Sequence, residues 1–281
     1  PQEYIVDSQD GIKTPLGMAG IRLEAKVHIV TAAVTSAQNI VRCVNKAGLG
    51  VRDIVLEQLA SSESVLSSDE KELGVAMIDI GGGTSDLAIF YQESIKHTSV
   101  LTIAGTQMTN DIAIGLRTPN QEAEKIKNAH GCALSTLVAE DETIEVPSVG
   151  GRETRTVSRQ ILSEILEARA REMFEMLNHE INVSGFRDIV SSGIVLTGGA
   201  ASLPGMGELA EEIFQLPVRV GAPTNLGGLV DVVSSPMYAT STGLIQYGMK
   251  SLKAGTTHEL HGRHLFDKIF SRMKDWAEEF F

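Results

Sequence analysis

Hydrophobic residues along this chain follow two kinds of pattern: short unbroken runs, and longer stretches with helical spacing. Unbroken runs over residues 75–80, 87–91 and 194–196 are typical of buried strands, and residues 74–103 predict three strands joined by short polar turns. Weaker strand patterns cover residues 22–33, 51–57 and 143–149. Helical spacing predicts helices over residues 35–47, 120–129, 158–182 and 206–214, with a further helical section from residue 111. Residues 1–20 show little periodicity, and the composition of residues 251–262 is typical of a linker.

Two glycine-rich turns follow two of the apolar runs. They are DIGGGTSD (residues 79–86) and VLTGGAASLPGM (residues 195–206). Consecutive glycines let backbone N–H groups converge on an anion, because no Cβ holds a phosphate away. Asp79 and Thr84 flank the first turn, where a carboxylate can hold the water shell of Mg²⁺ and a hydroxyl can hold phosphate. Neither turn matches the dinucleotide fingerprint or the P-loop pattern.

A single run of glycines after a strand is more often a plain turn than a ligand site. The presence of two such turns, each after a strand that reads as buried, favours one nucleotide held between them.

Composition narrows the classes of protein that fit. The 281 residues are 42% hydrophobic and carry a formal net charge of −12, so the chain can bury a large core, and nucleic acid is not expected as a partner. The only cysteines, Cys43 and Cys132, favour small buried hydrophobic residues in a reducing compartment over a disulfide framework. The histidines show no ligand spacing with these cysteines, so no structural zinc is expected. No apolar run is long enough to span a membrane.

The C-terminal stretch, residues 265–281, has the sharpest amphipathic pattern in the chain. Projected as a helix, its apolar residues fall within an arc of roughly 160° and its charged residues fall on the other side. It holds four of the eight Phe and the only Trp, and a polar linker separates it from the rest. A terminal helix docked on the protein's own core is the alternative, but the aromatic face favours a helix lying in the plane of a membrane surface. The membrane-contacting residues would be Leu265, Phe266, Ile269, Phe270, Met273, Trp276, Phe280 and Phe281.

The order of these motifs resembles the actin, Hsp70 and sugar-kinase ATPase superfamily. DIGGGTSD is similar to its second phosphate motif, LTGGAASLPG (residues 196–205) to its adenosine motif, and AEKIK (residues 123–127) to a helix that reaches ribose and base. Residues 59–66 and 238–248 resemble its two connecting helices. The stretches PQEYIVD, GIVLTGGAA, HGCAL and VPSVGGR, with the amphipathic tail, resemble the FtsA family of bacterial cell-division proteins. The resemblance implies an α/β, actin-like (ribonuclease H-like) ATPase fold.

The resemblance also implies a site for ATP and Mg²⁺. Asp79 would hold Mg²⁺ through water, and Gly81, Gly82, Gly83 and Thr84 would hold the phosphates. Gly198, Gly199 and Ala200 would pack against adenosine, while Glu124 and Lys127 would reach the ribose and base; a solvated helix face is the alternative for those two. No general base stands out, so catalytic residues are not assigned and at most slow ATP hydrolysis is expected.

Nothing before Asp79 matches the superfamily's first phosphate motif, and the chain starts with Pro1. We therefore expect an N-terminally incomplete member of the family, for which ATP binding by this chain alone is in doubt. The expected organisation is a remnant of the inserted small domain (1–21), part of the first actin-like subdomain (22–72), second-half core with the phosphate motif (73–114), a small subdomain (115–190), second-half core with the adenosine motif (191–235), a connecting helix (236–250), a linker (251–264) and the membrane-targeting helix (265–281).

The family resemblance implies a protein that tethers filaments of the tubulin-like protein FtsZ to the cytoplasmic face of the bacterial inner membrane, at the division septum. The small subdomain would grip the acidic and apolar C-terminal tail of FtsZ, with Arg155, Arg159, Arg169 and Arg171 as candidate contacts; scattered solvated arginines are the alternative. Self-association into actin-like filaments and contacts with other division proteins are also expected. A pilus-assembly ATPase or another superfamily ATPase or kinase is the alternative function.

Overall fold

The computed structural model describes residues 1–150, 153–228 and 230–253. The chain divides into two compact units, one made of residues 1–28 and 57–246 and the other of residues 29–56 and 247–281. The amphipathic tail predicted from the sequence, with its eight membrane-contacting residues, lies outside the described residues.

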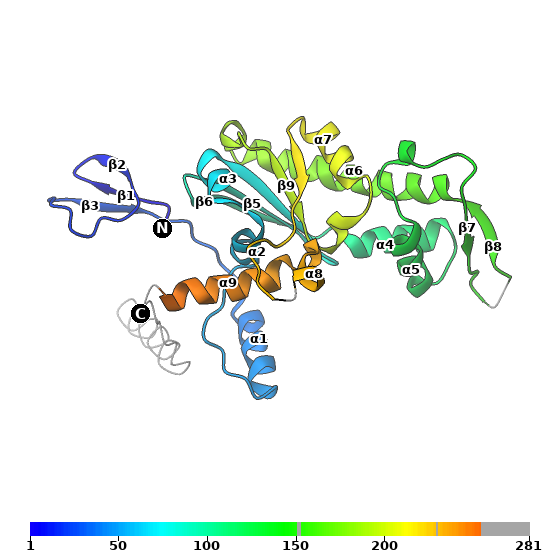
Figure 1. The fold of residues 1–281 in the computed structure, drawn as a ribbon, viewed down its shortest axis with the longest axis horizontal. Helices are drawn as coiled ribbons and strands as arrows, with labels where there is room; N and C mark the ends of the chain where they lie inside the picture. The colour runs from blue at the N-terminus through cyan, green and yellow to red at the C-terminus, as the bar shows by residue number, and fades with distance from the viewer. Residues whose placement is uncertain (151–152, 229, 254–281) are drawn as a thin grey trace, which may run out of the picture. The chain divides into compact units, whose positions relative to one another are not determined.

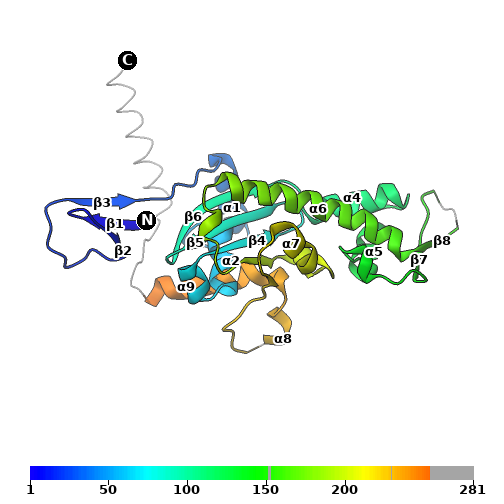
Figure 2. The ribbon, with the colours of Figure 1, turned by 90° about the horizontal axis from the view of Figure 1, so that it is seen from above.

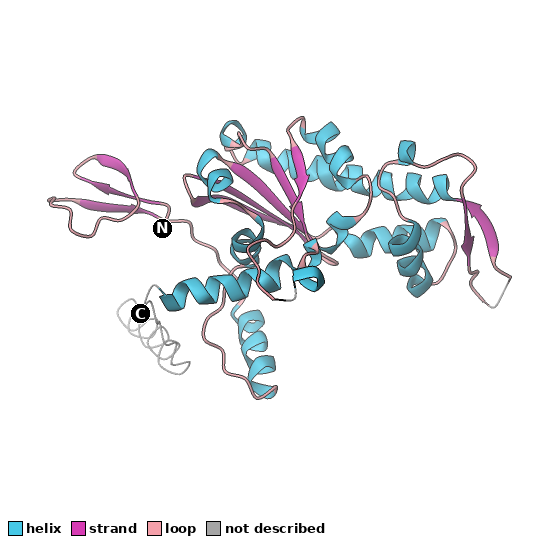
Figure 3. Cartoon of the chain, in the orientation of Figure 1, coloured by secondary structure: helices cyan, strands magenta, loops and turns pink. Residues whose placement is uncertain are grey.

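A five-stranded sheet is the centre of the larger unit (Figures 1 and 3). Its strand order is β10-β9-β4-β5-β6, with β4 (Val75–Ile80), β5 (Ser85–Tyr91), β6 (Ser94–Leu101), β9 (Ile194–Thr197) and β10 (Val218–Val220). The three strands predicted within residues 74–103 are confirmed as an antiparallel meander, and β9 runs parallel to β4. All residues of β4 are buried, which agrees with their unbroken apolar pattern.

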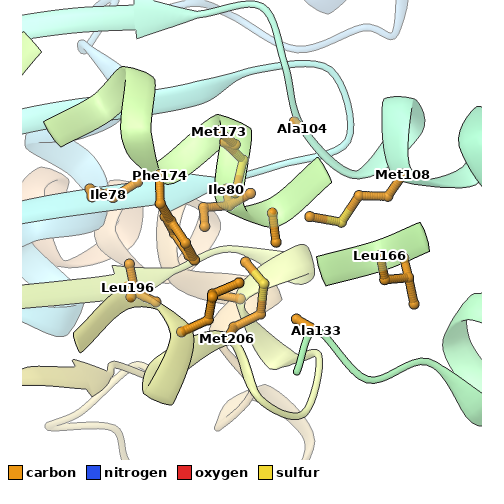
Figure 4. Close-up of a cluster of buried hydrophobic side chains, with 14 of the residues drawn as sticks. Ile78, Ile80, Ala104, Met108, Ala133, Leu166, Met173, Phe174, Leu196 and Met206 are labelled. Atoms are coloured by element: carbon orange, nitrogen blue, oxygen red, sulfur yellow. The ribbon is translucent and has the colours of Figure 1, made fainter. Parts of the chain in front are cut away.

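The two faces of β4 pack against different helices, because side chains alternate along a strand. Ile78 and Ile80 face a core that includes Phe174 of α6 (Arg159–Val183) and Met206 of α7 (Met206–Phe214), as Figure 4 shows. Val75 and Met77 face the opposite core, which includes Val65 of α2 (Glu57–Val65) and Ala239, where α9 (Ala239–Lys253) begins. The sheet is therefore the middle layer of three.

Helix α6 runs along the sheet and continues past its end, where it supports a smaller group of elements (Figure 2). That group consists of α4 (Gly105–Gly115), α5 (Asn120–His130), the 3-10 helix η1 (Ser135–Leu137) and the hairpin of β7 (Thr143–Val146) and β8 (Arg155–Ser158). The helices predicted over residues 120–129, 158–182 and 206–214 are confirmed to within a few residues. The helical section expected from residue 111 begins earlier, at Gly105, because Ala104 and Met108 are drawn into the same core as Ile80.

Residues 1–28 form a three-stranded antiparallel sheet in the order β2-β1-β3, with β1 (Glu3–Val6), β2 (Gln9–Ile12) and β3 (Leu23–Lys26). The weak periodicity of residues 1–20 predicted no strand there, so β1 and β2 were missed. Short strands with mostly exposed side chains carry no clear hydrophobic period. The domain boundary predicted after residue 21 also falls inside this sheet, since β3 pairs with β1 along its whole length.

The strand predicted over residues 51–57 is absent: residues 51–56 have no regular structure, and α2 begins at Glu57. A strand needs a neighbouring strand, and none in the described part of the chain pairs with this run. The helix predicted over residues 35–47 is confirmed as α1 (Val34–Lys46). The remaining elements are α3 (Ser68–Leu73), α8 (Val230–Val233) and the 3-10 helices η2 (Arg187–Ile189), η3 (Gly199–Ser202) and η4 (Pro236–Tyr238).

Candidate nucleotide site

The two glycine-rich turns lie side by side at one edge of the sheet. They follow β4 and β9, which are parallel neighbours with Asp79 opposite Thr197, so both turns leave the carboxyl ends of adjacent strands. Gly198 makes their close approach possible: a Cβ built there would overlap Asp79 Oδ1 and lie 2.5 Å from Ile80 O. Its φ of 87° and ψ of 166° lie in a region that is essentially restricted to glycine.

The first turn, residues 81–84, is open on its outer side. Within the turn, the Gly81 N–H donates to Thr84 O at 2.9 Å. A Cβ at Gly83 would meet no atom within 4 Å, and one at Gly82 would meet only the Thr106 hydroxyl at 3.8 Å. The inner side is held by the start of α4, whose Gly105 and Thr106 N–H groups donate to Gly81 O and Gly82 O at 3.1 and 2.7 Å. The turn thus presents free space to a ligand while its backbone is fixed from behind.

Asp79 lies just before this turn and is buried with 4% of its surface exposed. The Ser61 hydroxyl of α2 donates to its Oδ2 at 2.7 Å, and the Thr240 hydroxyl of α9 donates to the same oxygen at 3.3 Å. Burial raises the pKa of the Asp79 carboxyl, an effect that the bonds from Ser61 and Thr240 oppose and the charge of Asp86 reinforces.

Asp86 is the second residue of β5 and lies directly opposite Asp79 in the antiparallel pair. It accepts a hydrogen bond from Gln58 Nε2 at 2.9 Å, and burial raises its pKa. Burial also raises the pKa of Glu57, with contributions from the charges of Asp86 and Asp79. Three carboxyl groups therefore lie at one end of the site, where burial disfavours their charged forms. A divalent cation close by would offset that cost. Carboxylate oxygens are also the kind of ligand that Mg²⁺ prefers.

Among residues 1–150, 153–228 and 230–253, no group of three or more His, Cys, Asp or Glu side chains is placed to ligate a metal ion directly. Asp79 was expected to contact Mg²⁺ through water rather than as part of a protein cage, and this role stays a prediction.

The second turn lines a pocket of about 120 Å³ at the other end of the site. Its walls are formed by Met108, Lys127, Asn128, Gly199, Ala200, Ser202, Leu203 and Pro204. Lys127 is 8% exposed, and its Nζ donates to Gly105 O, Thr109 Oγ1 and Glu124 Oε2 at 2.9, 2.8 and 2.7 Å. The Glu124 side chain is 47% exposed. Burial alone would raise the pKa of Glu124, but bonds from Lys127 and Thr109 and the Lys127 charge hold it below its ordinary value.

The structure thus brings together the two turns, Lys127 and Glu124, which lie far apart in the sequence. Gly105 is at the junction, because its Cβ would come 3.2 Å from Gly81 O, 3.5 Å from Lys127 Nζ and 3.6 Å from the Ala200 Cβ. The alternative of a solvated helix face fits Lys125, which is exposed and paired with Glu122, but not the buried Lys127.

The four arginines expected to contact a partner peptide all have partners within the chain. Arg155 bonds to Leu116 O and Ser148, Arg159 to His130 O and Glu142, Arg169 to Asp111 and Glu172, and Arg171 to Glu167 and Glu212. Arg169 reaches α4 and Arg171 reaches α7, as expected for helix positions two residues apart. The expectation that these four arginines contact a partner peptide stays a prediction.

Sequence reasoning did not assign site roles to Gln58, Ser61, Gly105, Thr106 and Thr240. Gln58 and Ser61 are polar residues whose burial could not be read from the sequence, and Thr240 is a half-buried residue whose hydroxyl is brought to Asp79 by the packing of α9. Gly105 and Thr106 are the first residues of α4 shortly after β6, and a single glycine there lacks the run of glycines that had identified the other two turns.

Solved structures with a related fold include MreB5 of Spiroplasma citri bound to ADP, with a TM-score of 0.60 at 18% identity over 78% of this chain and 68% of that chain. The same protein bound to AMPPNP gives 0.60 at 19% identity over 80% and 68%. The double helical filament of MamK gives 0.55 at 12% identity over 76% and 66%. These likenesses, with the sheet order and the paired turns, define an actin-like fold.

Sequence comparison identifies the family within that class. A model of cell division protein FtsA matches residues 76–243, and a model of the SHS2 domain inserted in FtsA matches residues 1–31. Cell division protein FtsA of Pseudomonas aeruginosa is 51% identical over 99% of this chain and 68% of the relative, and that of Escherichia coli K12 is 46% identical over 89% and 61%. The chain belongs to the FtsA family. It spans 68% of the length of the Pseudomonas aeruginosa relative and 61% of that of the Escherichia coli K12 relative.

Proposed function

We propose that the protein carrying this chain is an ATP-binding cell-division protein that tethers FtsZ filaments to the cytoplasmic membrane and helps to assemble the division ring. The observation that carries the nucleotide part is the meeting of two glycine turns at one sheet edge, where Gly198 leaves no room for a Cβ against Asp79 and Ile80. Family membership supports the cell-division part.

In this proposal the nucleotide lies with its phosphates on the open turn and its nucleoside end in the pocket beside Ala200. Gly81, Gly82, Gly83 and Thr84 hold the phosphates, and Asp79 holds a Mg²⁺ ion through water. Gly198, Gly199 and Ala200 pack against adenosine, while Glu124 and Lys127 flank the nucleoside end. Bound Mg²⁺ supplies charge neutralisation at the phosphates. We assign no general base, so ATP acts mainly as a structural ligand with at most slow hydrolysis.

A Gly82→Asp variant tests nucleotide binding. Its carboxylate would occupy the space in front of the turn and repel phosphate, so affinity for Mg-ATP in titration calorimetry should be lost. The urea unfolding curve should stay unchanged, since a Cβ at Gly82 meets only Thr106 Oγ1 at 3.8 Å. Gly82→Asn is the matched control, with the same size and no charge, and should retain more affinity than the aspartate variant. Undiminished ATP binding by Gly82→Asp would overturn the assignment of the turn.

The tether requires a contact with FtsZ, which we propose for the region of residues 115–190 and the C-terminal tail of FtsZ. Arg155 and Arg159 lie near the β7–β8 hairpin, and their charges suit an acidic peptide. A pull-down with FtsZ and with FtsZ lacking its tail tests this contact. Equal recovery of both forms would reject the tail as the ligand, and recovery of neither would favour a pilus-type ATPase as the function.

We further propose attachment to the cytoplasmic face of the inner membrane through residues 265–281, and self-association into filaments at the septum. The described part of the chain contains no helix that is long and apolar enough to cross a bilayer. The aromatic face of the tail supports surface attachment. Filament formation by MamK, a protein of the same fold, supports self-association.

A further inference from the structure

The ammonium group of Lys127 makes three hydrogen bonds within the protein. A lysine ammonium has three N–H donors and no acceptor. In Lys127 they are directed to Gly105 O at 2.9 Å, Thr109 Oγ1 at 2.8 Å and Glu124 Oε2 at 2.7 Å. The residue is 8% exposed, so water does not compete strongly for these donors. No donor remains for a ribose hydroxyl or a base.

Two of the three acceptors, Gly105 O and Thr109 Oγ1, lie near the start of α4, and the first two residues of α4 bond to the phosphate-binding loop. The Gly105 N–H donates to Gly81 O at 3.1 Å, and the Thr106 N–H donates to Gly82 O at 2.7 Å. Lys127 Nζ donates to the carbonyl oxygen of the same Gly105. A continuous chain of hydrogen bonds therefore runs from the side chain of Lys127 in α5, through Gly105, to the backbone of the loop.

We propose that Lys127 is a positioning residue that fixes the phosphate loop through the start of α4, and that it makes no polar contact with the nucleoside. This inference rests on the proposed nucleotide-binding function and changes the role expected for Lys127. Lys127 is one of the residues that line the pocket beside Ala200, and its Nζ is bonded to Gly105 O, Thr109 Oγ1 and Glu124 Oε2. Glu124 keeps an acceptor toward solvent: its Oε2 is held by Lys127, and its Oε1 accepts only a 3.2 Å bond from Asn128 among the described residues. The polar contact with the nucleoside from α5 then belongs to Glu124.

A ligand without ribose or base separates the two roles of Lys127. If Lys127 acts through the phosphate loop, Lys127→Met weakens binding of Mg-tripolyphosphate and of Mg-ATP by the same factor, expected to be about tenfold or more for the loss of charged hydrogen bonds. If Lys127 instead binds the nucleoside, affinity for ATP falls and affinity for tripolyphosphate does not, and the proposal is wrong. Lys125→Met, in the same helix but exposed and paired only with Glu122 in the described structure, is the matched control and should change neither affinity.

Hydrogen exchange without any ligand gives an independent test. Lys127→Met should speed exchange of the Gly105 and Thr106 amides, which donate to the loop, relative to Lys125→Met. Unchanged exchange at both amides would refute the proposal even if ATP affinity fell. Should Lys127→Met not fold, Thr109→Val removes one of the three acceptors and should show the same pattern in a weaker form. If the unaltered full-length protein that carries this chain binds neither ligand, the nucleotide function is refuted, whereas the exchange result still decides the role of Lys127.

Discussion

Gly198 provides the most demanding test of how the two turns are joined. A Gly198→Ala variant must place its residue at φ 87° and ψ 166°, a region that costs a non-glycine residue about 1–3 kcal/mol. The new methyl group also overlaps Asp79 Oδ1 and lies 2.5 Å from Ile80 O. Crowding of this kind in a packed interior costs about 1–3 kcal/mol. The two contributions predict a loss of about 2–6 kcal/mol in the free energy of unfolding, a large share of the roughly 5–15 kcal/mol typical of a native protein.

Urea unfolding followed by circular dichroism measures this loss, and the next residue supplies the control. A Cβ at Gly199 would meet only the Met237 Cβ at 3.8 Å, and Gly199 does not have a positive φ. Gly199→Ala should therefore change the free energy of unfolding by less than about 1 kcal/mol. In Gly198→Ala, relief of the clash must push Asp79 or the β4 end away, so affinity for Mg-ATP should fall together with stability.

Equal stability of the two alanine variants would refute this reasoning. It would mean that the ends of β4 and β9 can separate freely, and that the close approach of the turns is not fixed by the sheet. A stability loss without any loss of ATP affinity would instead show that Asp79 is not part of the nucleotide site.

Two further predictions concern pH and the C-terminal tail. The raised pKa values of Asp79, Asp86 and Glu57 mean that the folded protein holds more protons than the unfolded chain between the ordinary and the raised values; the free energy of unfolding should thus fall as pH rises through that window and level off above it. Asp79→Asn should flatten this fall and raise stability at neutral pH without Mg²⁺, and a steeper fall in urea titrations from pH 4 to 8 would contradict it. Deletion of residues 265–281, or Trp276→Glu, should abolish co-sedimentation with lipid vesicles at low and high salt alike, because insertion rests on aromatic burial. A melting temperature lowered by several degrees without lipid would show instead that the tail packs on the protein core.

The strands that carry the site could be predicted because their signals are local. Residues 75–80 form an unbroken apolar run because both faces of β4 are covered by helices, and the glycines after it mark the turn. The same reasoning failed for residues 51–57, where a strand-like pattern has no partner strand in the described structure. It also failed for residues 1–20, because the strands of a small exposed sheet lack a continuous buried face.

Residues that act through burial could not be predicted from the pattern of the chain. Gln58 and Ser61 occupy helix positions that would usually face solvent if read from their polarity alone. The structure buries them against Asp86 and Asp79, where they donate hydrogen bonds to carboxylates. Lys127 is a similar case, because a lysine in a charged helix reads as exposed until α4 brings two of its three acceptors, Gly105 O and Thr109 Oγ1, against it.

Within the site, the start of α4 was the part that the sequence pattern predicted least well. Gly105 and Thr106 are poor helix formers, and a helix chosen for propensity would avoid them. Ala104 and Met108 anchor this turn in the core, so packing rather than propensity stabilises it. A Cβ at position 105 would come 3.2 Å from Gly81 O, which is a tight contact with backbone, and 3.5 Å from Lys127 Nζ. Glycine lets the phosphate loop and Lys127 both approach this backbone segment closely, and this close approach offsets the cost of glycine to the helix.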